Sequence, residues 1–279
     1  MIGGREPSIE DGARLDYIRY EQIHEHIALI TLDRPDRLNA FGSVMRAEFE
    51  ESLQRAEHDD AVRVVIVTGA GRAFCAGADV KEWASGTGPL ESTPPPAPSN
   101  EHGTTDLLKP MIAAINGYCL GAGLNLVATR CDIRIAGESA QFGMPEVARG
   151  TISRTVPFAI EGLSRAFLSE LLYTGDHVSA QRALQGGLIN AVVPDGEVMT
   201  AAISMAQRIA RHSPAAVRAT KLNYLKTFEA TPAAVVWEQR LRERVSTTTE
   251  THEGMQAFIE RRPPSWSAAR NQDVEDAQP

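Results

Sequence analysis

A glycine-rich segment, Gly69–Trp83 (GAGRAFCAGADVKEW), follows a near-continuous apolar run, Arg63–Thr68. Such a run is typical of a strand buried on both faces of a parallel sheet. Glycines allow the backbone to approach a ligand closely, and a helix that begins near Asp79 would offer unpaired N–H donors. The segment therefore predicts a site for an oxyanion or a phosphate, although a turn that needs glycine only for its bend explains it equally.

A second segment, Asn116–Leu126 (NGYCLGAGLNL), has the same order of strand, glycines and helix. Two such junctions could direct two backbone N–H donors at one carbonyl oxygen, as an oxyanion hole requires. No GxxxxGK[ST] or GxGxxG pattern occurs in the chain, so neither a P-loop nor a dinucleotide fingerprint is indicated.

A third segment, Ala140–Gly150 (AQFGMPEVARG), carries Glu146 among apolar residues, just after a proline. Apolar surroundings favour the neutral form of a carboxylate, which suits general acid–base work. The alternative is a glutamate that only complements a helix dipole.

The elements that must position these segments alternate strand and helix early in the chain, and helices dominate from about residue 156 to 258. That order predicts an α/β core followed by a C-terminal helical region. The expected elements are a hairpin of Tyr17–Tyr20 and His26–Leu32, a helix that Ser43 caps and that runs to about His58, strands Arg63–Thr68, Lys109–Asn116 and Asp132–Ala136, and a helix starting at Thr231.

The formal net charge of the 279-residue chain is -8, which argues against nucleic-acid or anionic-membrane partners. Its three cysteines form no CxxC pair, so reduced thiols in a cytoplasmic protein are expected. The first residues lack the apolar core of a signal peptide, and no apolar run is long enough to span a membrane. His24 and His26 alternate on one expected strand face, but no further ligand suggests a metal site.

The three segments, in this order and spacing, resemble the crotonase (enoyl-CoA hydratase/isomerase) superfamily. The similarity continues in RPDRLNAF (34–41) and EGMQAFIERRPPSW (253–266). The resemblance implies an acyl-CoA substrate without a further cofactor, and a homotrimer or a dimer of trimers. It also implies a spiral of ββα units, with a leader at 1–15, a core at 16–200 that contains a mobile loop at 85–104, a C-terminal helical trimerisation region at 201–265 and a tail at 266–279.

The resemblance assigns the two oxyanion N–H donors to Ala78 and Ala122, and the acid–base role to Glu146. It also implies a set of positions close to coenzyme A, which are Arg37, Ala40, Ala76, Ala78, Asp79, Val80, Lys81, Phe258 and Arg261.

One departure concerns the second catalytic carboxylate. Hydratases of the family use two glutamates, and Asn125 stands at the position of the first. Asparagine does not titrate, so it cannot act as a general base, although it can orient a water or the thioester. The sequence therefore leaves open a hydratase, a Δ3,Δ2-enoyl-CoA isomerase, another reaction of the fold (decarboxylation or C–C hydrolysis) and a CoA-binding pseudoenzyme.

A second departure follows Glu146, where Gly150–Phe158 (GTISRTVPF) stands in place of the family's usual glycine-rich continuation, and Arg149 and Arg154 place two cations close to the site in sequence. They are either surface arginines or cations that face a polar or carboxylated acyl group. Trp83, Leu107, Leu108 and Phe158 are candidates for an apolar acyl pocket, or for ordinary core packing.

Overall fold

The structure is a computed structural model that describes residues 15–84, 107–153, 162–227 and 249–265, together with residues 236, 240 and 243. The expected leader, the loop at 85–104, the tail, the helix start at Thr231 and the residues Arg154 and Phe158 lie outside this part.

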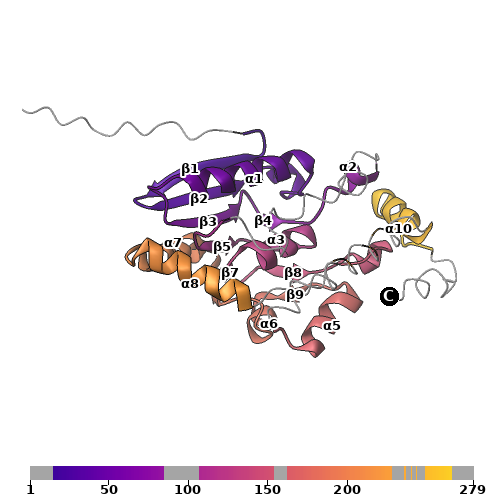
Figure 1. The fold of residues 1–279 in the computed structure, drawn as a ribbon. Coiled ribbons are helices and arrows are strands. Elements are labelled where there is room, and N and C mark those ends of the chain that lie inside the picture. Colours follow the sequence, from indigo (N-terminus) through magenta and orange to yellow (C-terminus); the bar gives the residue numbers. More distant parts are fainter. Residues whose placement is uncertain are drawn as a thin grey trace, which may run out of the picture.

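The larger of two sheets has six strands in the order β1-β2-β3-β5-β7-β10 (Figure 1). The first pair is antiparallel and all later pairs are parallel. Its strands are β1 Ile18–His24, β2 Ile27–Leu32, β3 Val64–Gly69, β5 Met111–Ile115, β7 Ile133–Gly137 and β10 Ala191–Val193.

The smaller sheet has the order β4-β6-β8-β9 and is parallel except for its last pair. Its strands are β4 Ala73–Cys75, β6 Tyr118–Leu120, β8 Gln141–Gly143 and β9 Val178–Ser179. Each has two or three residues, which is too short for a periodic pattern, so these four strands were not predicted from the sequence, and neither was β10.

Three successive passes of the chain share one pattern. Each adds a strand to the large sheet, then a strand to the small sheet, and then a helical turn. The passes are β3–β4–α2 (Val80–Ala84), β5–β6–α3 (Ala122–Arg130) and β7–β8–η2 (Val147–Arg149). This repetition confirms the expected spiral of ββα units.

Alternating side chains of the large sheet form two cores. Val65 and Val67 pack toward α1 (Ser43–His58) and the small sheet, whereas Val64 and Ile66 pack against α7 (Val198–Ala210) on the opposite face. Because both faces are covered, the parallel strands contain continuous apolar residues.

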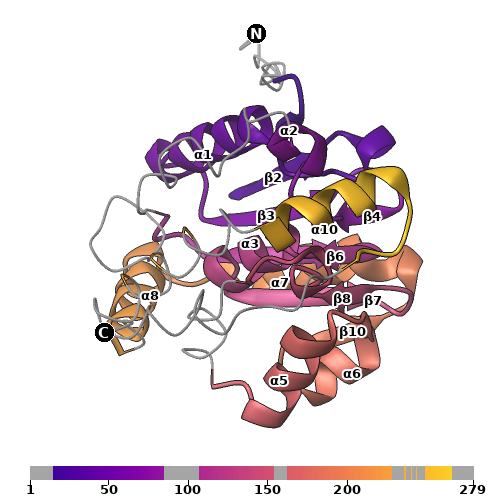
Figure 2. The same cartoon turned by 90° about the vertical axis from the view of Figure 1, so that its right-hand side faces the viewer.

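The remaining helices follow the strands. In Figure 2, α10 faces the viewer between α2 and the small sheet, and it contacts both α2 and η2. Their bounds are η1 Pro35–Arg37, α5 Arg165–Thr174, α6 Ala180–Gln185, η3 Asp195–Glu197, α8 Pro214–Thr227 and α10 Thr249–Glu260. Helix α7 crosses the boundary that was expected at residue 200.

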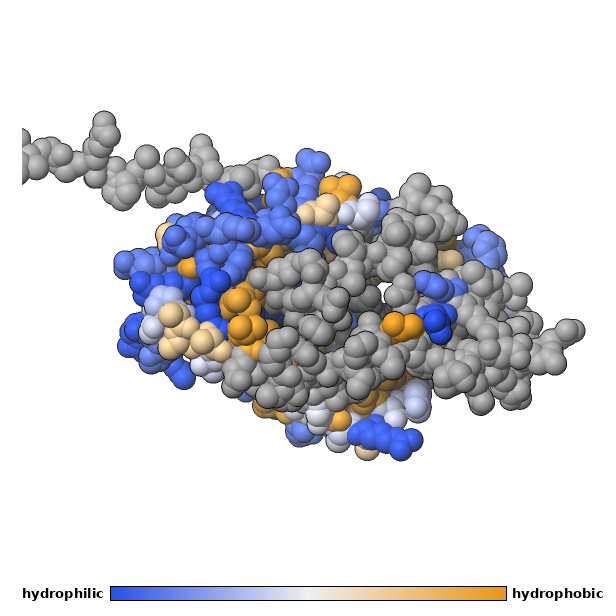
Figure 3. All heavy atoms as spheres, viewed as in Figure 1, coloured by the Kyte–Doolittle hydropathy of each residue, from blue (hydrophilic) through white to orange (hydrophobic). Residues whose placement is uncertain are grey.

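The outer surface over α1 and the β1–β2 hairpin is mainly hydrophilic (Figure 3). No helix among the described residues is long and apolar enough to cross a membrane.

The expected hairpin, the helix from Ser43 to His58 and the strands beginning near residues 63, 109 and 132 are confirmed. The placement of His26 on a strand was wrong. It lies in the turn between β1 and β2 with φ 68°, and its ring bonds the carbonyl of Ala61. Among the described residues, no group of three or more His, Cys, Asp or Glu side chains could hold a metal ion.

The amide side chains of two asparagines, one buried and one half-buried, stabilise the turn from β3 to β4, where the chain passes from one sheet to the other. Asn39, which is fully buried with φ 57°, accepts from the Arg34 amide and donates to the carbonyls of Ala70 (2.9 Å) and Ala73 (2.8 Å). Asn116 donates from the other side to the carbonyls of Gly69 and Gly71. These bonds satisfy backbone groups that the sharp turn leaves without strand partners.

We predict that Asn39→Ala lowers the free energy of unfolding by at least about 2 kcal/mol, because it orphans buried backbone groups at both ends of the turn. Asn39→Asp retains the acceptor and the tolerance for positive φ but loses both donors, so an intermediate loss is expected. Urea denaturation followed by circular dichroism measures both. A loss of unfolding free energy below about 0.5 kcal/mol for Asn39→Ala would contradict this role of the Asn39 side chain.

Candidate active site

The first backbone donor of the candidate site lies where β4 leads into α2. Gly77 has φ 116° and its carbonyl accepts from the amide of Phe41 at 2.8 Å, which ties the segment to the loop after β2. The next residue, Ala78, is exposed and forms an isolated bridge with Phe41. Within the described part of the chain, the amide of Ala78 has no recorded acceptor.

The second donor lies at the start of α3. Gly121 has φ 48° and ψ -115°, a conformation that favours glycine, and Ala122 is the first helical residue. A Cβ on Gly123 would lie 2.7 Å from the carbonyl oxygen of Cys75, so glycine there lets α3 pack directly on β4. The amide of Ala122, one of the orphan donors of a helix N-terminus, has no recorded acceptor in the described residues.

The two junctions meet in space. A Cβ built on Gly121 would lie 3.7 Å from the Cα of Gly77. The residues that precede Ala78 and Ala122 are therefore in contact, and the structure brings the two predicted donors into one neighbourhood. The arrangement can present two preorganised N–H groups to one oxyanion.

Glu146 belongs to the same cluster. The half-buried residue precedes η2, and its Oε1 would be 2.9 Å from a Cβ on Gly121. Its Oε2 accepts from the hydroxyl of Ser153 at 2.9 Å. Ser153 is 5% exposed and holds one carboxylate oxygen, which leaves the other directed at the glycine junctions.

Asn125 lies in the first turn of α3, three residues after Ala122. Its Oδ1 is buried and has no hydrogen-bond partner in the described structure. An unsatisfied buried acceptor is uncommon in native proteins and marks a place where a water or a ligand group can donate.

The positions expected near coenzyme A form two groups. The loop that carries Arg37 and Ala40 runs beside residues 76–79, because the Ala76 amide donates to the carbonyl of Leu38 at 3.0 Å. Arg37 is about half exposed, with only a 3.7 Å contact to Asp36. Val80 is half-buried and Lys81 is exposed on α2.

The second group lies on α10, which packs back on its own chain. The ring of Phe258 lies 4.5 Å from the guanidinium of Arg149, and Arg261 follows the helix with φ 56°. Glycine at position 254 makes this packing possible, because a Cβ there would collide with the carbonyl of Arg149.

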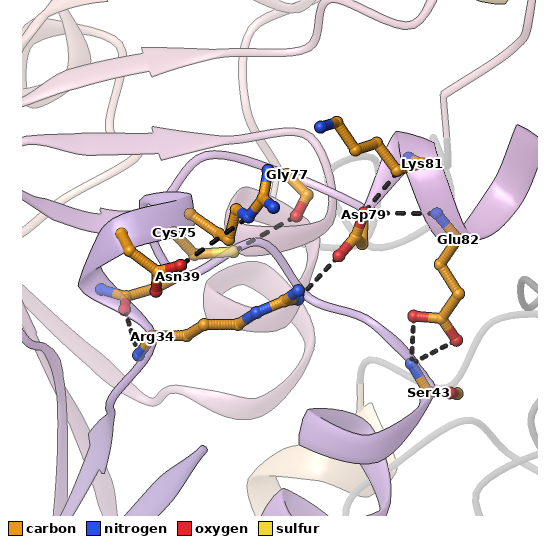
Figure 4. A network of polar contacts seen from close by, with 10 residues as sticks. Arg34, Asn39, Ser43, Cys75, Gly77, Asp79, Lys81 and Glu82 are labelled. Atoms are coloured by element: carbon orange, nitrogen blue, oxygen red, sulfur yellow. Dashed lines mark hydrogen bonds and ion pairs between the residues drawn. The ribbon is translucent and has the colours of Figure 1, made fainter. Parts of the chain in front are cut away.

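Asp79 is occupied by structural contacts. Its Oδ1 caps α2 by accepting from the amides of Lys81 and Glu82, and its Oδ2 pairs with Arg34 at 2.6 Å (Figure 4). The carboxylate of Glu82 then accepts from the amide of Ser43 at the start of α1. Ser43 was expected to cap α1, but Gly42 holds the cap position and Glu82 provides the acceptor.

Arg34, Asn39, Glu82 and Ser153 were not predicted as site residues. Their partners are 5 to 45 positions away in the chain, and no local pattern connects them. The spacing of RPDRLNAF identifies the loop but not which side chain holds it.

The structure also places two of the acyl-pocket candidates and the three cysteines. Leu107 is 1% exposed in the core, and the amide of Leu108 binds Glu57, near the end of α1 opposite Ser43. Their place in an acyl pocket stays a prediction, as does that of Trp83, whose side chain lies outside the described residues. Cys75, Cys119 and Cys131 are buried free thiols, and burial raises the pKa of Cys75 to about 12.

Burial alone would raise the pKa of Asp79, but the hydrogen bond from Arg34 and the amides of α2 outweigh burial and hold this pKa below its usual value. The contribution of the Asp79 carboxylate to the free energy of unfolding is therefore complete above pH about 4 and is lost as the pH falls through the lowered pKa. We predict that Asp79→Asn costs about 1–2 kcal/mol of unfolding free energy at pH 7, and less below pH about 4.

Urea titrations at pH 7, 5 and 3.5 measure this difference, with Asp36→Asn as the control because the Asp36 side chain is 75% exposed. A cost of Asp79→Asn that does not change with pH would contradict the assignment.

The chain is similar to known proteins over most of its length. The family model for enoyl-CoA hydratase/isomerase matches residues 22–269. The probable mitochondrial enoyl-CoA hydratase of Dictyostelium discoideum is 37% identical over 248 residues, which cover 86% of this chain and 87% of the relative. The 2,3-dehydroadipyl-CoA hydratase of Escherichia coli (strain K12) is 34% identical over 247 residues, 87% of this chain and 95% of the relative.

Among solved structures, a carnitinyl-CoA hydratase from Mycobacterium avium superposes with a TM-score of 0.78 at 36% identity, over 92% of this chain and 100% of that chain. The matched family model, the curated relatives and the shared two-sheet spiral lead to one conclusion. The chain belongs to the enoyl-CoA hydratase/isomerase (crotonase) family of enzymes that act on acyl-CoA.

Proposed function

We propose that the carbonyl oxygen of an acyl-CoA thioester binds between the amides of Ala78 and Ala122, and that Glu146 transfers a proton at C2. The contact of the Glu146 carboxylate with Gly121, beside Gly77, carries this proposal. Negative charge develops on the thioester oxygen when water adds to C3 or when C2 loses its proton, and the two amides stabilise that charge until a proton is returned. One such donor is typically worth about 2.7–4 kcal/mol in the transition state.

The favoured reaction is reversible hydration of a 2-enoyl-CoA. The oxygen of water bonds to C3, the proton that water loses goes to Glu146, and a proton from Glu146 reaches C2. Asn125 supports this step through its buried Oδ1, which can accept from the attacking water. Relatives at 34–37% identity that are named hydratases also support it.

Asn125 also favours a second candidate, the Δ3,Δ2-enoyl-CoA isomerase. There Glu146 removes a proton from C2 of a 3-enoyl-CoA, the double bond moves to C2–C3, and Glu146 returns the proton at C4. No water is consumed and no second carboxylate is required.

Coenzyme A is proposed to follow Arg37, Ala40, Ala76 and Asp79–Lys81. Phe258 on α10 and Arg261 just after this helix are proposed to contact coenzyme A as well. The exposed Lys81 and the half-exposed Arg37 support this path, since their charges complement phosphate groups.

Assembly as a trimer or a dimer of trimers, and a cytoplasmic location, are proposed on the family resemblance and the composition. The relatives from Dictyostelium discoideum and Pongo abelii are named mitochondrial. Sedimentation of the full chain and tagging at either end test these two points.

We predict that Glu146→Gln slows exchange of the C2 protons of butyryl-CoA in deuterium oxide by about 10²–10⁴-fold, because the amide cannot accept the proton. NMR follows the exchange, and calorimetry should give unchanged butyryl-CoA binding. Exchange at the wild-type rate in this variant would exclude Glu146 as the acid–base group.

The same assay series separates the two reactions when crotonyl-CoA and a 3-enoyl-CoA are supplied in parallel. Hydration that falls in Asn125→Ala and rises in Asn125→Glu supports the hydratase. Rapid isomerisation with negligible hydration supports the isomerase.

We also predict that Gly121→Ala lowers kcat by about 10²-fold or more, because its Cβ would displace Oε1 of Glu146 from the amide pair. Gly162→Ala is a matched control. Gly162 also has a positive φ, 72°, but a Cβ there would have no neighbour within 4 Å, so Gly162→Ala places an alanine at positive φ without the collision. Equal losses of activity in the two variants would refute the role of Gly121.

A further inference from the structure

Arg149 lies one helical turn after Glu146, on η2. In a 3₁₀-helix, residues i and i+3 lie on the same side, so Arg149 is adjacent to the proposed acid–base residue. Its side chain is half-buried, and its guanidinium carbon lies 4.5 Å from the centre of the Phe258 ring. Among the described residues, no carboxylate lies within ion-pair distance of Arg149 and its guanidinium has no recorded hydrogen bond.

This environment is costly for a cation. Burial lowers the pKa of Arg149, although the nearby Glu146 opposes the shift. Buried arginines are normally paired with an anion or hydrogen-bonded, because the guanidinium offers five donors. The guanidinium of Arg149 lies over an aromatic ring, and within the described part of the chain no acceptor occupies its donors, which remain available for a ligand.

The backbone at Arg149 and Gly150 is held against α10. Gly254 of α10 packs against the Arg149 carbonyl, and the Thr251 hydroxyl donates to the carbonyl of Gly150 at 2.6 Å. Thr251 and Gly254 are buried. A cation that is held in place before the ligand arrives gains affinity because little side-chain freedom is lost on binding.

We propose that Arg149 binds a carboxylate carried by the acyl group of the substrate, so that the enzyme prefers enoyl-CoA esters of dicarboxylic acids. This inference rests on the proposed function, because it takes Glu146 to mark the position of C2. The planar guanidinium can bind a carboxylate through two parallel hydrogen bonds.

The phosphates of coenzyme A are the other anions of the ligand, but the pantetheine arm separates them from the thioester. The acyl chain begins at the thioester, beside Glu146. Arg149 is three residues from Glu146, about 6 Å along a 3₁₀-helix, which is within reach of a short acyl chain.

The test compares two saturated, unreactive ligands of equal carbon number, adipyl-CoA and hexanoyl-CoA, by isothermal calorimetry. We expect adipyl-CoA to bind about tenfold or more tightly to the wild type, because a charged hydrogen-bonded pair is added. Arg149→Leu should abolish this preference with little effect on hexanoyl-CoA. Arg149→Lys should retain part of it.

Arg182→Leu is the matched control. Arg182 also lies over a phenylalanine ring, 4.9 Å from Phe167, but it pairs with Glu170 on α5. Its loss should leave the preference unchanged. Thermal unfolding of each variant checks that the fold is intact.

Equal affinities of the wild type for the two ligands would overturn the proposal, as would an equal loss of both affinities in Arg149→Leu. The ratio of kcat/KM for 2,3-dehydroadipyl-CoA and 2-hexenoyl-CoA should follow the binding preference. Calorimetry does not require turnover. Preferred binding of adipyl-CoA by a protein that turns over neither enoyl-CoA would therefore refute the proposed reaction and still support the carboxylate site.

Discussion

The close packing of the α3 N-terminus on the end of β4 determines the geometry of the candidate site. Gly123 allows the helix to reach the backbone of Cys75, and Gly121 turns the chain so that Ala122 begins the helix. A side chain at position 123 would separate α3 from β4 and move the amide of Ala122 away from that of Ala78, whereas one at position 121 would meet the Glu146 carboxylate. Glu146 depends on the same contact, since its carboxylate occupies the space that a Cβ on Gly121 would fill.

Polar contacts outside the interface of α3 and β4 hold the segments that lead into it. Asn39 and Asn116 fix the turn that carries the chain from β3 into β4. Arg34 and Asp79 join the loop after β2 to α2, and Glu82 continues the chain of contacts to α1. Because most of these side chains are at least partly buried, each bond is worth more than a comparable surface pair. The donor of Ala78 is thereby positioned by residues that are remote in the sequence.

The site combines few charges, and their placement bears on specificity. The chain as a whole has a net charge of -8, yet Arg149 lies without an ion-pair partner in the described residues, next to the proposed acid–base residue. Asn125 contributes an uncharged acceptor where the family's hydratases have a carboxylate. In the proposed mechanism the backbone donors stabilise the enolate, whereas these side chains govern the choice of reaction and of acyl group.

The sequence by itself determined the family, the strand–glycine–helix order of the two donor segments and the position of Glu146, because those features are local motifs of glycines and apolar runs. It also determined the main elements of the large sheet, whose strands are long and apolar enough to recognise. The short strands of the small sheet were not predictable, since β4, β6 and β8 have only three residues each.

Only the tertiary structure decided how the segments meet. The contact between Gly77 and Gly121, the packing of Phe258 on Arg149 and the bond of Ser153 to Glu146 depend on how the spiral stacks its turns. The environment of Arg149 illustrates the physical reason. Whether an arginine is solvated at the surface or partly desolvated depends on what packs around it. For Arg149 this is α10, a helix about 100 residues further along the chain.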